Sequence, residues 1–316
     1  MSDMGTYPRG HTLRRGAPPA AQRSRMTRWL IGALSLCTLV GCNDASDDTH
    51  EVQDAEGALD AASTEDAAQS GSTAPPMCLW NQAYQENTAT DAIDVILDQA
   101  QGCYVLIDPF EAQAAADAIP ALHAANNTVG CYISVGTCED WRSDFEAMED
   151  HCTSTEWPEW PGEFFVTDPD GVAPSIKARI DQLATWGCDM VEFDNMDWAS
   201  DPEQSESFGL EVTHEEAIHY YVTLCDYVHA SGMLCMAKST REGGEVFDGG
   251  TFESFSDLKD WWDHDHLQSF LDQGRLGVIF HYDESNCDEA EAWYRERYGS
   301  GLSFLCEDPS VGGYLH

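Results

Sequence analysis

Short apolar runs alternate with longer amphipathic stretches from residue 78 onward. Each run has the length and composition of a buried strand, and the stretches between runs are long enough for helices. This alternation predicts a parallel sheet. Eight strands favour closure into a single (β/α)8 TIM-type barrel of class α/β, with an open doubly wound sheet as the alternative. The predicted strands span residues 78–80, 103–107, 129–135, 190–193, 233–237, 251–255, 277–281 and 302–306.

Three of the intervening stretches carry clear helix signals. In residues 90–100, apolar positions recur at helical spacing. A second helix has Pro174 in its predicted first turn and ends at Gly187, because proline suits a first turn and glycine suits the residue after a last turn. A third helix begins with a capping box between Thr213 and Glu216. These signals support the alternation of strands and helices that a barrel requires.

Residues 1–41 have the pattern of a bacterial lipoprotein signal peptide. Arginines precede an apolar run at 29–40, which ends in Leu-Val-Gly before Cys42. The run is too short to cross a bilayer as a helix. We therefore expect cleavage before Cys42, a lipid anchor on its thiol, and a location outside the cytoplasm, on the outer membrane or the cell surface. Met26 is a second candidate start, because the signal needs nothing that precedes it.

Residues 42–76 contain no aromatic residue and are rich in acidic and small residues. This composition is typical of a disordered linker, here an acidic tether between the anchor and the folded part. Residues 77–316 then form one domain. Its length of about 240 residues is usual for a single barrel.

The formal net charge of the whole chain is −42. A chain this acidic repels nucleic acid and anionic membrane surfaces, so we expect no nucleic-acid partner and no membrane contact beyond the lipid anchor. The acidity fits either a strongly hydrated surface or a cationic substrate.

Twelve cysteines are present, and ten remain once those of the signal and the anchor are set aside. An even number of cysteines in an exported protein predicts disulfides. We expect loop-closing pairs between Cys138 and Cys152 and between Cys287 and Cys306. Zinc is a weaker explanation, because the sequence contains no Cys-x-x-Cys pair.

The stretch 189–198 combines a short apolar strand with a cluster of polar residues. Glu192, Asp194, Asn195 and Asp197 lie in it, and burying carboxylates without partners is costly. The cluster is therefore either a solvated turn or a site of chemistry. Catalytic groups of a barrel lie at the C-terminal ends of its strands. Candidate groups lie at seven predicted strand ends: Trp80, Asp108, the segment after Tyr132, Asp194 with Asn195, Lys238, Glu253, and His281 with Tyr282.

Three motifs carry a resemblance to a known family. They are Tyr-Ile-Ser-Val-Gly at 132–136 continuing into Glu-Asp-Trp-Arg-Ser-Asp at 139–144, Trp-Pro-Gly-Glu at 160–163, and Val-Glu-Phe-Asp-Asn-Met-Asp at 191–197. With Lys238 and Glu253 following in order, they resemble the endo-α-1,4-polygalactosaminidase family of glycoside hydrolases over nearly everything from residue 78 onward. The resemblance implies a TIM-type barrel that cleaves α-1,4-linked galactosamine polymers without a cofactor. It also implies Asp194 and Glu253 as the catalytic pair.

Two carboxylates also suggest glycoside hydrolysis on chemical grounds. The reaction needs two carboxyl groups that flank one bond, one protonated and one ionised. Asp194 and Glu253 lie on different predicted strands and can face each other across a barrel mouth. We predict Asp194 as nucleophile or base and Glu253 as acid.

The predicted substrate is a cationic or partly deacetylated galactosamine polymer. Asp108 and Asp197 are expected to pair with the ammonium of a bound unit. The tryptophans Trp80, Trp141, Trp157 and Trp160 offer flat surfaces for sugar rings, or else they pack in the core. The predicted substrate contacts are Trp80, Asp108, Tyr132, Trp141, Asn195, Asp197, Lys238 and Tyr282.

Two other functions stay open. Residues 252–255 match the family pattern only loosely, which leaves a noncatalytic glycan-binding lipoprotein on the same barrel. The run Asp-His-Asp-His at 263–266 contains ligands for a metal-dependent polysaccharide deacetylase. Its apolar neighbours favour a helix with a solvated face, and we predict no metal site.

Overall fold

The computed structural model describes residues 76–84, 89–196, 198–199, 202–255, 262–282, 286–308 and 313–315. Its central sheet has nine strands in the order β1-β2-β3-β6-β7-β8-β9-β10-β11. The first eight of these are parallel to their neighbours and form a nearly closed barrel, and β11 is antiparallel to β10. The sheet strands are β1 Leu79–Asn81, β2 Tyr104–Ile107, β3 Thr128–Ser134, β6 Met190–Asp194, β7 Leu234–Lys238, β8 Gly249–Ser254, β9 Leu276–His281, β10 Ser303–Asp308 and β11 Gly313–Leu315.

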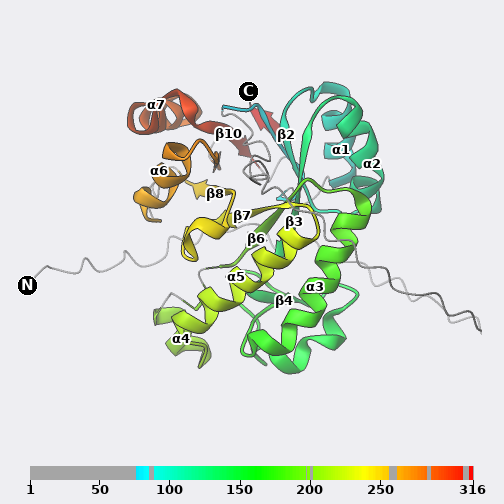
Figure 1. Ribbon diagram of the computed structural model, residues 1–316, viewed down its shortest axis with the longest axis vertical. Helices are drawn as coiled ribbons and strands as arrows, with labels where there is room; N and C mark the ends of the chain where they lie inside the picture. Colours follow the sequence, from blue (N-terminus) through cyan, green and yellow to red (C-terminus); the bar gives the residue numbers. More distant parts are fainter. Residues whose placement is uncertain are drawn as a thin grey trace, which may run out of the picture. The chain divides into compact units, whose positions relative to one another are not determined.

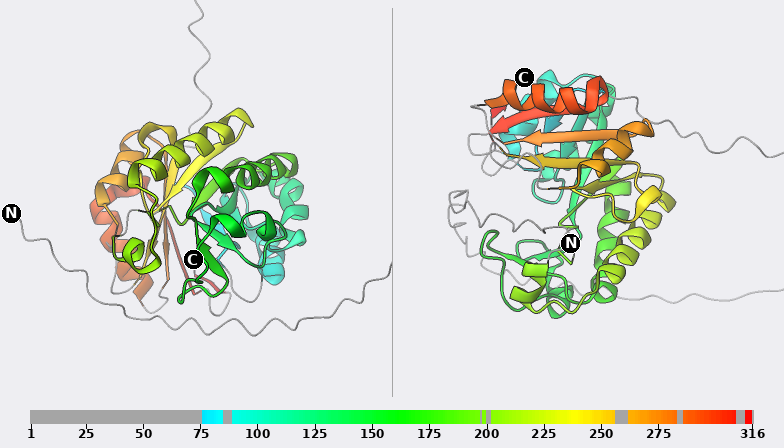
Figure 2. Two further views of the ribbon diagram at one scale, coloured as in Figure 1. Left: turned by 90° about the horizontal axis from the view of Figure 1, so that it is seen from below. Right: turned by 90° about the vertical axis from the view of Figure 1, so that its left-hand side faces the viewer.

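Helices surround the strands on the outside, as Figures 1 and 2 show. In the right-hand view of Figure 2, the yellow, orange and red strands β8, β9 and β10 run in the same direction. The helices are α1 Ala89–Gln99, α2 Gln113–Ala124, α3 Pro169–Trp186, α4 Pro202–Phe208, α5 His214–Ala230, α6 His264–Asp272 and α7 Cys287–Tyr298, with 3-10 turns at Phe145–Ala147, Glu149–His151, Gly244–Val246 and Gly299–Gly301.

A two-stranded hairpin lies outside the barrel, between β3 and α3. Its strands are β4 (Thr137–Glu139) and β5 (Glu163–Phe165), and they pair antiparallel. A disulfide between Cys138 and Cys152 ties the hairpin to the loop that joins its strands. Because the chain leaves the C-terminal end of β3 to make it, the hairpin adds to the barrel end where TIM-type sites lie.

Successive residues of each barrel strand face opposite sides, as the pleat requires. One buried apolar cluster fills the barrel and contains Leu79, Tyr104, Leu106, Tyr132, Met190, Met236, Leu276, Val278, Phe280 and Leu305. A second lies between the barrel and the helices and takes the alternate positions, among them Trp80, Val105, Ile107, Val191, Phe193, Cys235, Ala237, Phe252 and Ile279. A polar residue at an inward position therefore points into the barrel.

The barrel prediction is confirmed, and each of the eight predicted strands overlaps an observed one. The capping box between Thr213 and Glu216 begins α5 as predicted. The predicted start of the second helix is wrong. α3 begins at Pro169, because the Asp168 side chain caps it by accepting the Gly171 N–H (3.1 Å), and Pro174 therefore lies inside the helix.

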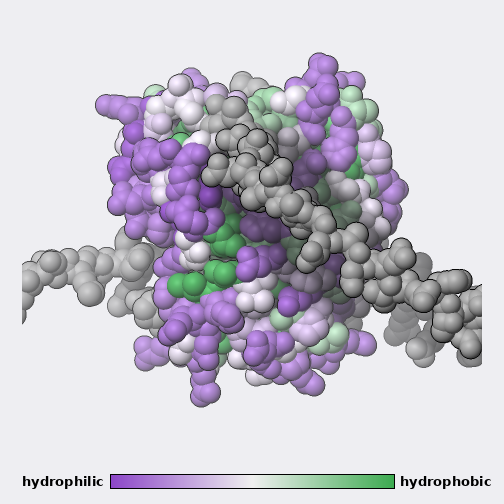
Figure 3. All heavy atoms as spheres, in the orientation of Figure 1, coloured by the Kyte–Doolittle hydropathy of each residue, from purple (hydrophilic) through white to green (hydrophobic). Residues whose placement is uncertain are grey.

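Ten cysteines form five disulfides, which include both predicted pairs. The other three are Cys78–Cys103, Cys131–Cys188 and Cys225–Cys235. Most of the residues visible in Figure 3 are hydrophilic, in keeping with the acidic composition. Among the described helices, none is both long enough and apolar enough to cross a bilayer. The signal peptide and the tether through residue 75, with Cys42, lie outside the described residues.

Candidate active site

Lys238 joins two carboxylates at the C-terminal ends of three adjacent strands. It ends β7, and its Nζ lies 2.9 Å from Asp194 Oδ1 on β6 and 3.4 Å from Glu253 Oε1 on β8. The ammonium also lies 4.2 Å from the centroid of the Tyr84 ring, which adds a cation–π contact. Burial opposes the charge of Lys238, but the neighbouring carboxylates raise its pKa above the ordinary value. Lys238 is therefore a permanent cation.

Asp194 is held by several groups that leave its carboxylate little freedom. Tyr132 donates its hydroxyl to Oδ2 (2.9 Å), and the Asn195 N–H donates to Oδ1 (2.8 Å). The Val135 N–H donates to the Asp194 carbonyl (3.1 Å), which ties this end of β6 to β3. Together with Lys238, these donors fix the position of the Asp194 carboxylate.

The residue after Asp194 adopts an unusual backbone conformation. Asn195 has φ +59°, a left-handed value that asparagine tolerates better than most residues. Gly136 permits it, since a Cβ at this glycine would lie 1.9 Å from the Asn195 carbonyl oxygen. The Asn195 side-chain amide lies within hydrogen-bond distance of Ser134 (3.0 Å) and Thr137 (3.1 Å), and of Glu163 Oε2 (3.1 Å). The hairpin thus orients the residue that follows Asp194.

Glu253 faces the same ammonium from the other side. Tyr282, which follows β9, donates its hydroxyl to Glu253 Oε1 (2.9 Å). The Trp262 indole N–H donates to the Glu253 backbone carbonyl (2.7 Å). The position and orientation of the carboxylate therefore depend on β8, on the end of β9 and on the segment before α6.

A third carboxyl group, Glu192, lies one inward position below Asp194. It is fully buried, and Tyr84 donates its hydroxyl to Glu192 Oε2. Burial raises the pKa of Glu192 to about 7, although Lys238 and the hydrogen bonds oppose the shift. The ion pairs of Lys238 are with Asp194 and Glu253.

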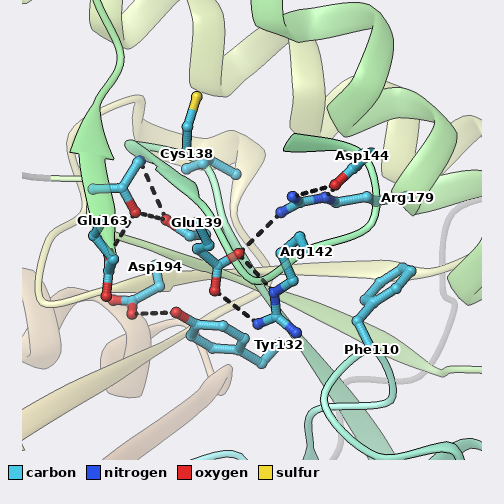
Figure 4. Close-up of polar contacts among 12 residues, drawn as sticks. Phe110, Tyr132, Cys138, Glu139, Arg142, Asp144, Glu163, Arg179 and Asp194 are labelled. Carbon is cyan, nitrogen blue, oxygen red and sulfur yellow. Dashed lines mark hydrogen bonds and ion pairs between the residues drawn. The ribbon is translucent and has the colours of Figure 1, made fainter. Parts of the chain in front are cut away.

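A buried chain of ion pairs supports the hairpin beside the site (Figure 4). Arg142 binds Glu139 (2.7 Å) and contacts both Asp108 oxygens (2.7 and 3.2 Å). Arg179 on α3 binds Glu139 (3.1 Å) and Asp144 (2.8 Å). The nearby carboxylates raise the pKa of both arginines against the effect of burial. Removing one member of such a network leaves a buried charge unpaired.

This chain of ion pairs changes the expected role of Asp108. Its carboxylate is 3% exposed and already accepts from Arg142 and from the N–H groups of Phe110 and Glu111. The structure gives Asp108 a structural role in this network, and its contact with a substrate ammonium stays a prediction. Asp197, the other predicted ammonium partner, lies outside the described residues.

The structure brings together most of the other predicted site residues. Tyr132, Asn195, Lys238 and Tyr282 all contact Asp194 or Glu253. Trp80 does not belong with them: it is 5% exposed and packs in the outer apolar layer. The correction follows from strand alternation, because the inward residue at this end of β1 is the neighbouring Asn81.

The tryptophans of the hairpin region are arranged differently. Trp141 is 48% exposed and Trp160 is 37% exposed. Residues of the hairpin region pack against both rings. A Cβ on Gly162 would lie 2.9 Å from the Trp141 ring, and the ring centroids of Trp157 and Trp160 are 6.1 Å apart. The hairpin therefore presents aromatic faces to solvent.

Comparison with known proteins identifies the chain. The model of glycoside-hydrolase family GH114 matches residues 62–316. The chain belongs to this family. As a GH114 member it is a glycoside hydrolase, and the family resemblance of its motifs is confirmed. No curated protein matches it.

Two solved structures share the fold of this GH114 chain. The first is Ega3 from Aspergillus fumigatus in complex with galactosamine, with a TM-score of 0.62, 19% identity, and coverage of 80% of this chain and 99% of that chain. The second is the glycoside hydrolase domain of PelA from Pseudomonas aeruginosa, with a TM-score of 0.52, 16% identity, and coverage of 78% and 98%.

Side chains of the Asp-His-Asp-His run have partners in and around α6. Asp263 caps α6, His264 contacts the Tyr298 hydroxyl, and His266 Nδ1 accepts the Arg241 N–H (3.1 Å). Within the described ranges, no group of three or more His, Cys, Asp or Glu side chains is arranged to hold a metal ion. The run therefore forms the start of α6, the helix that its apolar neighbours predicted.

Sequence reasoning missed some groups that surround the GH114 site. Tyr84, Arg142 and Glu163 were not singled out as functional. Arg142 and Glu163 do lie within the resembling motifs, which was the available signal. Nothing in the local pattern around Tyr84 indicates that it contacts Glu192 and Lys238.

We expect Lys238→Met to abolish most turnover and to lower the free energy of unfolding by about 3–5 kcal/mol, because it leaves the partly buried carboxylates of Asp194 and Glu253 without their cation. Urea unfolding and initial rates measure the two effects. Lys177→Met is the matched control, since Lys177 makes a cation–π contact with Tyr227 (5.4 Å) away from the carboxylates. A Lys238 variant as stable and as active as that control would refute the central role of the ammonium.

Proposed function

We propose that this GH114 protein is an endo-acting hydrolase of α-1,4-linked galactosamine-rich polysaccharide, with Asp194 and Glu253 as its catalytic carboxyl groups. The observation that carries the proposal is the position of both groups on one ammonium, at the C-terminal ends of the two strands that flank β7. That is the end of a TIM-type barrel where catalytic residues lie. Two carboxyl groups at one point are the machinery that glycoside hydrolysis requires.

The spacing of the two carboxyl groups supports hydrolysis with retention of configuration. Asp194 Oδ1 and Glu253 Oε1 lie 2.9 Å and 3.4 Å from the same nitrogen, so they are no farther apart than the sum of these distances. This limit applies to the nearest two oxygens, and it favours the ~5–5.5 Å spacing of retaining enzymes over the ~6.5–9.5 Å of inverting enzymes. The carboxylates are therefore close enough for a covalent glycosyl intermediate.

The groups that surround each carboxyl group indicate which one is the nucleophile and which one is the acid and base. Asp194 accepts from Lys238, Tyr132 and the Asn195 N–H, a set that holds the carboxylate in one orientation for attack. We assign Asp194 as the nucleophile, which bonds to the anomeric carbon as the glycosidic bond breaks. Glu253 gives its proton to the leaving oxygen in the same step, and its carboxylate then takes a proton from the water that displaces Asp194 from the anomeric carbon. Tyr282 orients Glu253 for both steps.

The substrate class rests on family membership and on charge. Ega3, which shares the fold, was crystallised with galactosamine. A chain with a formal net charge of −42 attracts a polymer that carries protonated amino groups. The exposed rings of Trp141 and Trp160 provide apolar faces for sugar units of such a chain. Asp197 stays the predicted partner of an ammonium.

We expect Asp194→Asn and Glu253→Gln each to reduce oligosaccharide release from partly deacetylated α-1,4-galactosaminan by ~10²–10⁴-fold or more, because each removes a positioned acid or base. Both substitutions keep the shape of the side chain, so the variants should still bind the polymer. Asp181→Asn on the surface of α3 is the control, and it should leave the rate unchanged. A rate near the wild-type value in either site variant would reject the assignment.

We further propose that the protein is a lipoprotein attached to a bacterial membrane through Cys42. The Leu-Val-Gly-Cys sequence after an apolar run of signal-peptide length supports this. Cys42→Ala should leave the precursor unprocessed or release the protein from membranes. Metabolic labelling with a fatty-acid analogue measures the effect. Equal labelling of the wild type and the variant would contradict the proposal.

A further inference from the structure

Glu163 on the hairpin is a buried carboxyl group that the catalytic steps above do not use. It is 6% exposed. Its Oε2 accepts the Thr137 hydroxyl (2.6 Å) and the Asn195 side-chain amide (3.1 Å). Thr137 in turn contacts Ser134 (2.6 Å), the last residue of β3. Glu163 thus connects the hairpin, the end of β3 and the residue after Asp194.

Through Asn195, this contact reaches the proposed nucleophile. Asn195 holds a left-handed backbone conformation, and its N–H donates to Asp194 Oδ1 (2.8 Å). The side-chain amide that Glu163 accepts and the N–H that Asp194 accepts belong to the same residue. A shift of Glu163 therefore moves or frees the donor that orients the Asp194 carboxylate.

The charged groups around Glu163 offer it no cation of its own. Lys238 is shared by Asp194 and Glu253. The two nearby arginines bind Glu139, Asp108 and Asp144. Glu139 and Asp194 face Glu163 as like charges, and Tyr132 is a further ionisable neighbour. Burial, with these like charges, raises the pKa of Glu163 to about 8, although Thr137 and Lys238 oppose the shift.

We propose that Glu163 is a positioning residue for the hydrolytic reaction. In its protonated form, Glu163 holds Asn195, and through Asn195 it holds the Asp194 carboxylate. The proposal rests on Asp194 being the nucleophile. An ionised Glu163 is a buried charge without a counterion, and its cost is relieved when the hairpin opens to admit water. Opening frees Asn195 and leaves Asp194 without its backbone donor.

The same protonation has a consequence for stability. The unfolded chain releases the Glu163 proton near the ordinary glutamate pKa of ~4.3, whereas the folded chain keeps it until about pH 8. Between these values the folded state binds more protons than the unfolded state, so this group lowers stability as the pH rises. Above the folded pKa its effect is constant. Glu163→Gln removes this pH-dependent contribution to the free energy of unfolding.

The test compares kcat from pH 5 to pH 9 for the wild type, Glu163→Gln, Glu163→Ala and Glu156→Gln. Glutamine reproduces the neutral acid, so this variant should have kcat within about twofold of the wild type at pH 6 and several-fold above it at pH 9. Alanine removes the acceptor and should lower kcat by about tenfold or more at every pH with little change in KM. Glu156, an exposed carboxylate that accepts the Gly162 N–H (3.2 Å), is the matched control and should follow the wild type.

Three outcomes overturn the proposal. They are an inactive Glu163→Gln variant at pH 6, a fall of kcat at alkaline pH that is the same in Glu163→Gln and the wild type, and a normal kcat in Glu163→Ala. A substrate-free measurement separates this failure from failure of the proposed function. The melting temperature of Glu163→Gln relative to the wild type should rise from pH 5 to pH 8 and then level off. A difference that does not change with pH would show that Glu163 carries no proton in the folded protein, whatever the substrate is.

Discussion

One buried ammonium governs the arrangement of this site. Lys238 lies between Asp194 and Glu253 and keeps its charge because carboxylates outweigh the effect of burial. Two carboxyl groups of like charge would otherwise repel each other at such short range. The shared cation makes their close approach favourable, and it holds the nearest oxygens of the two groups on one nitrogen.

The barrel supplies the positions that this interaction needs. β6, β7 and β8 are consecutive in the sheet, and Phe193 pairs with Ala237 while Lys238 pairs with Thr251. Because every second residue points inward, the last inward positions of the three strands converge on one point. The hairpin after β3 then adds a second level of control. Asn195 and Glu163 fix the donor to Asp194, and the paired arginines keep the hairpin in place.

Local patterns in the sequence predicted the parts of the fold that depend on neighbours in the chain. Apolar runs located the eight strands, and the Thr213 capping box located the start of α5. The strand-end argument found Asp194, Lys238 and Glu253. It failed for Trp80, because an apolar run of three residues does not reveal which of them faces inward.

Other parts of the site depend on residues that are far apart in the chain. The contact between Arg142 and Asp108 joins residues 34 positions apart in the sequence, and the contact between Tyr84 and Glu192 joins residues 108 positions apart. Neither contact leaves a local pattern in the sequence. The sequence therefore could not show that Asp108, at the end of its strand, is already paired with Arg142. The pairs Cys131–Cys188 and Cys78–Cys103 were missed for the same reason, since they need the barrel to bring their strands together.

The measurement that tests the account most directly is the configuration of the first product. Proton NMR during hydrolysis of an α-1,4-linked galactosamine oligomer follows the anomeric signals of the new reducing end before mutarotation. Carboxyl groups held on one ammonium predict that the α-anomer appears first, because retention needs the short spacing. Initial release of the β-anomer would contradict the account, because it requires a water between carboxylates that lie farther apart than Lys238 allows.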